Sequence, residues 1–193
     1  PLPNVKVHLH KHIPIGAGLG GGSSDAAFFI KLLNEKFELG ISWGEMHNYA
    51  RQLGSDCSFF ISNKPAFAEG RGDQYESTLV DLSKYFIALI YPAVHINTAK
   101  AYGGVQPKQA VRSLEEDIQN LSPDQWKEHI HNDFEDSIFP QFPELKKIKE
   151  ELYSRGAIYA SMSGSGSTLY GIFNEATDLK EVFKDCFVFE GRL

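Results

Sequence analysis

The residues best suited to chemistry in this 193-residue chain form a glycine-rich loop near its N-terminal end. Five of the nine residues from Gly16 to Ser24 are glycine, a strand-like segment precedes them, and an apolar helical run follows. Consecutive glycines let several backbone N–H groups face one point, and a helix N-terminus attracts negative charge. The loop can therefore bind phosphate without a lysine. A flexible linker fits less well, because linkers do not usually join a strand directly to a helix.

Two nucleotide-binding patterns can be compared with this loop. A Walker A loop requires lysine at the position of Gly22, so the loop is not a P-loop. The spacing Gly16-x-Gly18-x-x-Gly21 does satisfy the dinucleotide fingerprint, with Glu35 or Glu38 placed for a ribose contact. That fold needs a parallel strand soon after the helix, where a second helix is expected instead. A nicotinamide-dependent oxidoreductase stays open as an alternative function.

Two further polar segments carry candidate site residues. Asp56 follows Gly54, which ends a predicted helix, and its carboxylate could accept the proton of an alcohol during phosphoryl transfer. The alternative is that Asp56 caps a short turn at residues 58–60. The segment from Ser163 to Ser167 joins two predicted strands with more residues than a tight hairpin needs. Its amides would then be free to face the active site, although a plain hairpin loop is the alternative.

Composition excludes several classes of protein. The net charge of −6 and the pI near 5.6 provide no general basic surface for nucleic acid. Two cysteines without CxxC spacing indicate neither a disulfide framework nor a redox motif, so a reducing cytoplasm is expected. No apolar run is long enough to span a membrane, and no partner other than a small molecule is expected. Alternating histidines at 8, 10 and 12 lack matching carboxylates or cysteines, which argues against a metal site there.

The elements that must position these residues predict an α+β fold. Alternation over residues 4–10 predicts a half-buried strand, and a helix is expected from Asp25 onward. Ser42 and Glu45 have capping-box spacing before a helix over 43–53. Strands are expected at 66–69, 86–91, 157–162, 168–173 and 186–190, and helices from 113, from 122, over 143–156 and over 176–185. The second half resembles a ferredoxin-like βαββαβ unit, which places a boundary near 78–84 and divides the chain into 1–80 and 81–193.

Three motifs in order resemble the GHMP small-molecule kinases. The first runs from Lys11 to Ala27 through the glycine-rich loop, the second is the Gly54-Ser55-Asp56 segment leading into residues 65–72, and the third is Met162 to Ser167. The resemblance spans residues 4 to about 175. It implies a two-part GHMP kinase fold, a cytoplasmic enzyme, ATP and Mg²⁺ as cofactors, and transfer of a phosphoryl group to an alcohol. The triple glycine at 20–22 is typical of the branch whose substrate is cytidine diphosphate methylerythritol.

The resemblance also assigns roles to individual residues. It implies Asp56 as the catalytic residue. Nucleotide phosphates are expected on the first loop, at Pro14, Ile15, Gly16, Ala17, Gly18, Leu19, Gly20, Gly21, Gly22, Ser23 and Ser24. The substrate is expected at Thr98, Tyr102, Ser163, Gly164, Ser165 and Gly166, with the Tyr102 ring stacked on cytosine or, alternatively, in the core. The metal ligands and the oligomeric state stay open, and Lys11 is either a nucleotide contact or a solvated side chain.

The resemblance has one further consequence for the start of the chain. Family members continue before this point, where they carry the first strands of the ATP-binding part and a lysine that pairs with the catalytic aspartate. The chain is therefore expected to be N-terminally truncated, with an exposed strand edge beside residues 5–9 and little or no kinase activity by itself. A catalytically inactive nucleotide-binding module is a third alternative.

Overall fold

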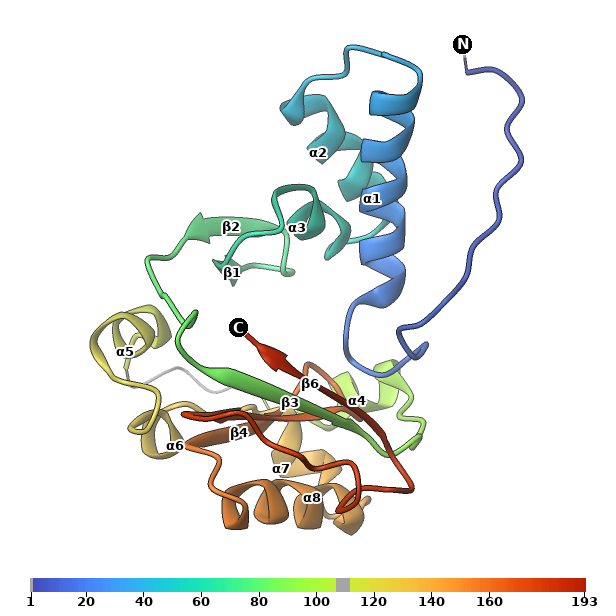
Figure 1. Cartoon of the computed structure of the whole chain (residues 1–193). Coiled ribbons are helices and arrows are strands. Elements are labelled where there is room, and N and C mark those ends of the chain that lie inside the picture. The colour runs from blue at the N-terminus through green and yellow to red at the C-terminus, as the bar shows by residue number, and fades with distance from the viewer. Residues whose placement is uncertain (1, 107–111) are drawn as a thin grey trace.

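A computed structural model of the chain describes residues 2–106 and 112–193. Its N-terminal part consists of three helices and a hairpin that stand above a sheet (Figure 1). The helices are α1 (Gly21–Lys36), α2 (Trp43–Leu53) and α3 (Cys57–Ser62), and the antiparallel hairpin is formed by β1 (Ala66–Glu69) and β2 (Gln74–Ser77). The glycine-rich loop lies at the lower end of α1, where this part meets the rest of the molecule.

The C-terminal part is built on a four-stranded antiparallel sheet. Its strands are β3 (Phe86–Tyr91), β4 (Tyr159–Met162), β5 (Leu169–Phe173) and β6 (Phe187–Arg192), in the spatial order β4-β5-β3-β6. The first of these strands in sequence pairs with both the third and the fourth, which is the ferredoxin-like order predicted from the sequence.

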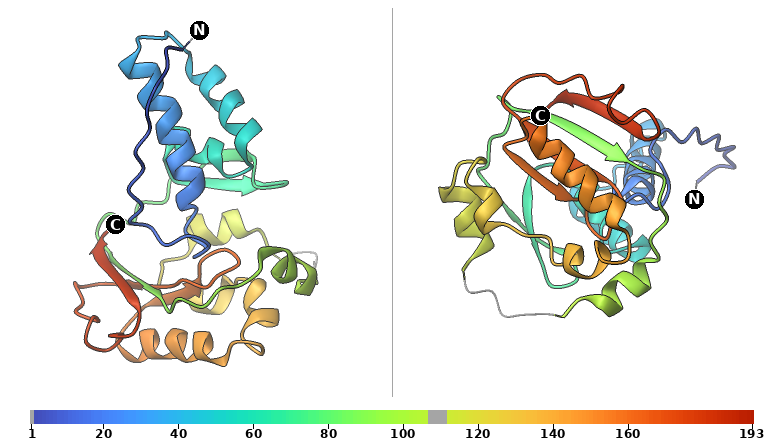
Figure 2. Two further views of the ribbon diagram at one scale, coloured as in Figure 1. Left: turned by 90° about the vertical axis from the view of Figure 1, so that its right-hand side faces the viewer. Right: turned by 90° about the horizontal axis from the view of Figure 1, so that it is seen from below.

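Five helices accompany this sheet. They are α4 (Thr98–Gly104), α5 (Leu114–Asn120), α6 (Trp126–His129), α7 (Phe134–Ile138) and α8 (Pro143–Ser154). The longest, α8, lies under the face of the sheet that is turned away from the N-terminal part (Figure 2). Pro143 occupies its first turn and Gly156, at φ +94°, follows its end, so the predicted boundaries of this helix are confirmed.

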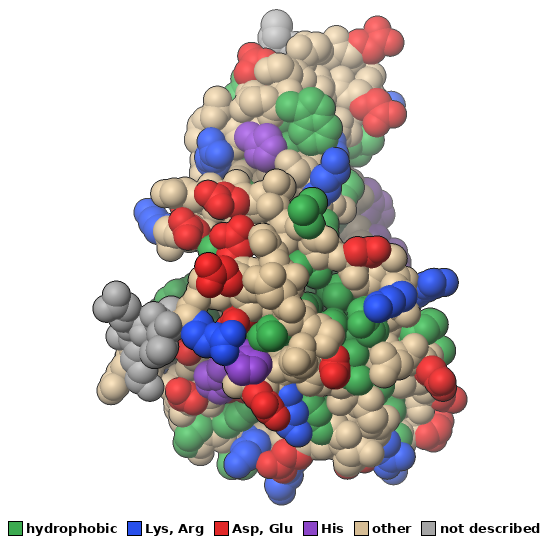
Figure 3. Space-filling model, turned by 90° about the vertical axis from the view of Figure 1, so that its left-hand side faces the viewer, with side chains coloured by type: hydrophobic (Ala, Val, Ile, Leu, Met, Phe, Trp, Pro, Cys, Tyr) green, Lys and Arg blue, Asp and Glu red, His purple; other side chains and the backbone are tan. Residues whose placement is uncertain are grey.

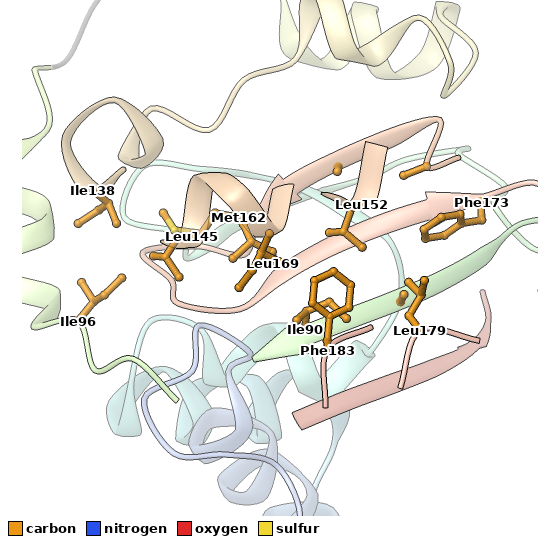
Figure 4. Packing of buried hydrophobic residues seen from close by; sticks show 14 of the residues in the cluster. Ile90, Ile96, Ile138, Leu145, Leu152, Met162, Leu169, Phe173, Leu179 and Phe183 are labelled. Carbon is orange, nitrogen blue, oxygen red and sulfur yellow. The ribbon is translucent and has the colours of Figure 1, made fainter. Parts of the chain in front are cut away.

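The main core lies between α8 and the sheet (Figure 4). Helix α8 contributes Leu145, Ile148 and Leu152, whose spacing of three and four residues places them on one helical face. Strands β3 and β5 contribute Ile90 and Leu169, which are fully buried. This packing fixes the position of β4 and β5, and therefore of the loop that joins them.

A smaller core holds the three N-terminal helices together. Ala27 of α1, Ala50 of α2 and Ile61 of α3 are fully buried against one another. Helix α2 begins with the predicted capping box, in which the Ser42 hydroxyl and the Glu45 carboxylate satisfy each other's backbone N–H groups. This core holds the start of α1 and the start of α3 side by side.

Four predictions of elements were wrong. Residues 4–10 are extended and run alongside α1 (Figures 1 and 2), but they pair with no strand in the described part of the chain. Helix α1 begins at Gly21 rather than at Asp25, and α6 begins at Trp126 rather than next to Pro123. The segment 176–185 forms turns instead of a helix. There, Glu190 of β6 accepts hydrogen bonds from the Thr177 hydroxyl and the Leu179 amide, which ties the segment to the sheet.

Candidate active site

The glycine-rich loop uses left-handed backbone conformations to enter α1. Gly16, Gly18 and Gly20 have φ angles of +69°, +78° and +64°, which L-residues with a side chain rarely adopt. Gly20 is the N-cap of α1, and no side chain caps this helix end. The first backbone N–H groups of a helix have no intrahelical acceptor and carry the positive end of its dipole. Gly21, Gly22 and Ser23 therefore present an anion-binding helix end that is continuous with the loop.

The Asp56 carboxyl lies in the same cavity as this loop. The cavity has a volume of about 390 Å³, and its lining includes Gly18, Leu19 and Gly20 of the first loop, Asp56 at the start of α3, and Ser163 of the second loop. Asp56 stands at the N-cap position of α3, yet its side chain makes no capping hydrogen bond. The capping alternative for Asp56 is therefore wrong. Its exposed carboxylate is free to act on a molecule in the cavity.

The two glycine-containing loops touch through their backbones. The Ser163 hydroxyl donates a hydrogen bond to the Gly18 carbonyl at 2.7 Å, and the Thr168 amide donates to the Ala17 carbonyl at 3.1 Å. A Cβ atom at position 18 would lie only 2.3 Å from the Ser163 carbonyl oxygen. Glycine is required at position 18 both by its φ angle and by this close approach. The segment 163–167 is thus more than a hairpin connection, because it contacts the first loop and its Ser163 lines the cavity.

Tyr75 on β2 is a wall of the cavity that sequence reasoning did not identify. Its hydroxyl donates a hydrogen bond to the Ser55 carbonyl at 3.0 Å, which ties the hairpin to the residue before Asp56. Burial raises the pKa of the Tyr75 phenol above 10.0, and the negative charge of Asp56 raises it further. The phenol is therefore neutral at pH 7. In the sequence, Tyr75 is recognisable only as a tyrosine in a strand that follows a glycine turn. That pattern is not specific for a residue of a functional site.

The other predicted substrate residues lie outside this cavity. Thr98 is the first residue of α4, whose N-cap is Asn97, and Tyr102 lies one turn later on the same helix. The Tyr102 side chain is 66% exposed and packs edge to face against Phe134, with ring centroids 5.0 Å apart. The core alternative for Tyr102 is wrong, because most of its ring is open to solvent. Lys11 is held in an ion pair with Asp25 of α1.

The segment 132–135 contains a buried carboxylate. An acidic side chain near the start of a short helix is usually solvated, but the Glu135 side chain is only 3% exposed. It pairs with Lys149 of α8 and accepts a hydrogen bond from the Met162 amide. Asn132 donates hydrogen bonds to the Met162 and Gly164 carbonyls. This contact with the second loop joins residues that are 27 to 32 positions apart, and local sequence gives no sign of it.

The face of the molecule in Figure 3 is not generally positive, because a group of acidic side chains lies on it at mid-height. Among residues 2–106 and 112–193, no three histidine, cysteine or carboxylate side chains are grouped as metal ligands. None of the helices described is long and apolar enough to cross a membrane. Because this face carries no general positive charge, directed N–H groups such as those at the start of α1 must hold an anionic ligand.

Comparison with known proteins decides the family. The profile of the GHMP kinases N terminal domain matches residues 2–68, and that of the GHMP kinases C terminal matches residues 114–187. The chain belongs to the GHMP kinase family. The dinucleotide-binding alternative is wrong, because it needs parallel strands and every strand pair in the described residues is antiparallel.

Two similar relatives and one solved structure carry the name of the same enzyme. The chain is 51% identical over 174 residues to the 4-diphosphocytidyl-2-C-methyl-D-erythritol kinase of Azobacteroides pseudotrichonymphae, which covers 90% of this chain and 65% of that protein. It is 49% identical to the enzyme of the same name from Bacteroides thetaiotaomicron, over 98% of this chain and 69% of that one. A crystal structure of 4-(cytidine 5'-diphospho)-2C-methyl-D-erythritol kinase superposes on the chain with a TM-score of 0.74 at 27% sequence identity. The match covers 94% of this chain and 68% of that one. This GHMP kinase chain spans about two thirds of the length of these relatives.

Proposed function

We propose that the protein containing this chain transfers the γ-phosphoryl group of ATP to the 2-hydroxyl of 4-diphosphocytidyl-2-C-methyl-D-erythritol, a step toward isoprenoid precursors. The observation that carries this proposal is the single cavity that Asp56 shares with Gly18, Gly20 and Ser163. Two relatives that are about half identical to the chain carry the name of that enzyme. The partner is then a small molecule, and the two free cysteines suit the reducing cytoplasm.

The chain's own residues supply positioning and charge to this reaction. The amides of the loop from Gly16 to Gly20 and of the start of α1 are suited to hold the nucleotide phosphates. The Asp56 carboxylate would accept the proton of the acceptor hydroxyl while the hydroxyl oxygen bonds to the γ-phosphorus and the bond to ADP breaks. Phosphoryl transfer needs little other covalent help from a protein, so alignment and electrostatics account for most of the catalysis.

The residues proposed to bind the nucleotide and to act on the acceptor also suit Mg²⁺. Asp56 lines the cavity and offers a carboxylate, and Ser23 and Ser24 in the first turn of α1 offer hydroxyls, all of which are hard oxygen donors. Magnesium is usually held by one or two carboxylates together with substrate phosphates rather than by a dedicated cage of side chains. The ion would neutralise charge on the phosphates. We also propose a division of the chain at residue 80, because the two family profiles match on either side of it.

The acceptor side is proposed to include Thr98, Tyr102 and the segment from Ser163 to Gly166. Tyr102 presents an exposed aromatic ring on α4, and stacking of a base on such a ring contributes about 1–3 kcal/mol. The Gly164 and Ser165 amides have no hydrogen-bond acceptor in the described part of the chain, so they are available to a ligand. A long acceptor could reach from Tyr102 along this loop toward Asp56.

The test is an assay of ADP release by the full gene product that contains this chain, with ATP, Mg²⁺ and the proposed acceptor. We expect ADP release that depends on this acceptor, and an Asp56→Asn variant should lower kcat by about 10²- to 10⁴-fold while ADP still binds. Asp81→Asn, at an aspartate outside the cavity, is the matched control. Turnover of mevalonate or homoserine without turnover of the proposed acceptor would overturn the substrate, and an Asp56→Asn enzyme within tenfold of the parent would overturn the role of Asp56.

A further inference from the structure

The segment from Asn132 to Glu135, at the start of α7, contacts the acceptor side of the site at two separate places. One is the second glycine-containing loop and the other is Tyr102. We infer that Asn132, Phe134 and Glu135 are positioning residues that hold this loop and the Tyr102 ring in a fixed relation to each other. The inference builds on the proposed function, because it concerns how the proposed acceptor is oriented.

Asn132 uses its whole side-chain amide for this purpose. Its Nδ2 atom donates to the Met162 carbonyl at 2.7 Å and to the Gly164 carbonyl at 2.9 Å, while its Oδ1 atom accepts the Phe134 amide at 3.0 Å. A flipped amide would place oxygen against two carbonyl oxygens, so only one orientation satisfies the site. Serine or alanine could not make both bonds to the loop. Asparagine is therefore specifically required at position 132.

Glu135 holds the same point of the loop from the other side. Its Oε1 atom accepts hydrogen bonds from the Met162 amide at 2.8 Å and the Ser161 hydroxyl at 3.1 Å, and its Oε2 atom pairs with Lys149 at 2.5 Å. A buried carboxylate is tolerated only when it is paired and hydrogen-bonded in this way. Met162 thus has its N–H bound by Glu135 and its carbonyl bound by Asn132. The last residue before the loop is fixed on both sides.

The fixed loop in turn meets the phosphate-binding loop. Ser163, which follows Met162 directly, donates its hydroxyl to the Gly18 carbonyl. Asn132 holds the Gly164 carbonyl, and this fixes the peptide plane that also contains the Ser165 amide, which has no acceptor in the described part of the chain and is available to a ligand. It also holds the Met162 carbonyl, in the peptide plane of the Ser163 amide, which donates to the Thr168 carbonyl. Misplacement of a reacting group by about 1 Å can cost about a hundredfold in rate. The Asn132 contacts are therefore in a position to control how the acceptor is aligned.

Phe134 links the segment to the second element. Its ring packs against Tyr102 at an interplanar angle of 83°, and helices α4 and α7 are in contact. Edge-to-face packing of this kind restricts the rotation of the Tyr102 ring while leaving most of it exposed. One short segment therefore sets the distance between the proposed base-stacking ring and the loop that leads to Asp56.

The main test is Asn132→Asp in the full gene product. The change keeps the side-chain shape, removes the donor to both carbonyls and places negative charge against them. We expect kcat/KM for the proposed acceptor to fall by about ten- to a hundredfold, with the ADP dissociation constant unchanged within about twofold. The matched control is Asn120→Asp, because Asn120 also donates Nδ2 to a backbone carbonyl, that of Glu116, but lies on α5. Equal kinetics for the two variants would overturn the inference.

Hydrogen exchange tests the positioning role without any reliance on activity. Amides over residues 161–168 should exchange faster in Asn132→Asp and at the parent rate in Asn120→Asp. Unchanged exchange in Asn132→Asp would refute the inference even if the parent enzyme proved inactive on the proposed acceptor. Absence of parent activity would instead count against the proposed function, so the two failures are distinguishable.

A second variant keeps the inference testable if Asn132→Asp does not fold. Phe134→Leu should raise KM for the acceptor in the parent enzyme and have no further effect in a Tyr102→Ala background, because its effect acts through that ring. Additive effects of the two substitutions would show that Phe134 does not act through Tyr102.

Discussion

Substitution of Gly18 by alanine should separate the two loops that form the cavity. The new Cβ would lie 2.3 Å from the Ser163 carbonyl oxygen and 2.8 Å from that of Gly166, whereas real Cβ atoms essentially never approach closer than 3.0 Å. The loops must therefore move apart by about 0.7 Å, the difference between 3.0 and 2.3 Å. Backbone atoms cause this clash, so rotation of a side chain cannot relieve it.

Two separate effects set how much stability the Gly18→Ala variant should lose. An L-residue forced into the left-handed region at φ +78° costs about 1–2 kcal/mol. Loss of the Ser163-to-Gly18 and Thr168-to-Ala17 hydrogen bonds would cost about 1 kcal/mol each. For a chain of this size each kcal/mol lowers Tm by about 2–4 °C. A displacement approaching 1 Å at a reacting centre lowers the rate by about a hundredfold.

Gly40→Ala is a matched control for the first of these effects. Gly40 has φ +66°, but a Cβ there would meet no atom within 4 Å, so that variant carries the backbone strain without the clash. We expect Gly18→Ala to lower Tm by about 4–8 °C more than Gly40→Ala does. The ADP-release assay should show the hundredfold loss only for Gly18→Ala. Equal Tm and equal activity for the two variants would refute the argument that backbone contact between the loops builds the site.

Two further predictions concern the scaffold. Leu152→Ala should destabilise the protein by about 2–5 kcal/mol in urea unfolding, because Leu152 is fully buried between α8 and the sheet. The control is Leu79→Ala at an exposed position, which should change stability by less than about 0.5 kcal/mol. Similar unfolding midpoints for the two variants would contradict the assigned core. Ser42→Ala should lower Tm at pH 7, since the Ser42 hydroxyl and amide hold the pKa of Glu45 below 4.5. A lowered carboxyl pKa stabilises the fold above pH 4.5, and this contribution is lost as the pH falls through the lowered value. The difference in Tm between Ser42→Ala and the parent should therefore shrink below about pH 4. A difference in Tm that grows in acid would contradict this role of Ser42.

Local chemistry explains which features could be predicted from the sequence. The capping box at Ser42, the proline start of α8 and the glycine-rich loop each depend on residues within a few positions of one another. The alternation over residues 4–10 predicts a strand equally well, but a strand also needs a neighbour with which to form hydrogen bonds. Sequence periodicity contains no information about that neighbour, and the segment pairs with none in the described residues.

The same distinction separates the site residues. Asp56 and the two loops carry recognisable motifs, whereas the role of Glu135 depends on Lys149 and Met162, which lie 14 and 27 positions away. An acidic residue near the start of a short helix is usually solvated, so the local sequence around Glu135 favours an exposed side chain. Its burial becomes visible only when α7, α8 and β4 are packed together.

The arrangement places different demands on the two loops that meet at Gly18. The contact joins residues 145 positions apart in the chain, yet the atoms that a Cβ at position 18 would strike are the carbonyl oxygens of Ser163 and Gly166. Because these are backbone atoms, no change of side chain in the second loop can make room for a side chain at position 18. The second loop is instead held from behind, by the Asn132 amide and the Glu135 carboxylate at Met162. The geometry of the cavity therefore depends on Gly18 on one side, and on Asn132 and Glu135 behind the second loop on the other side. Removal of either should move the same pair of loops.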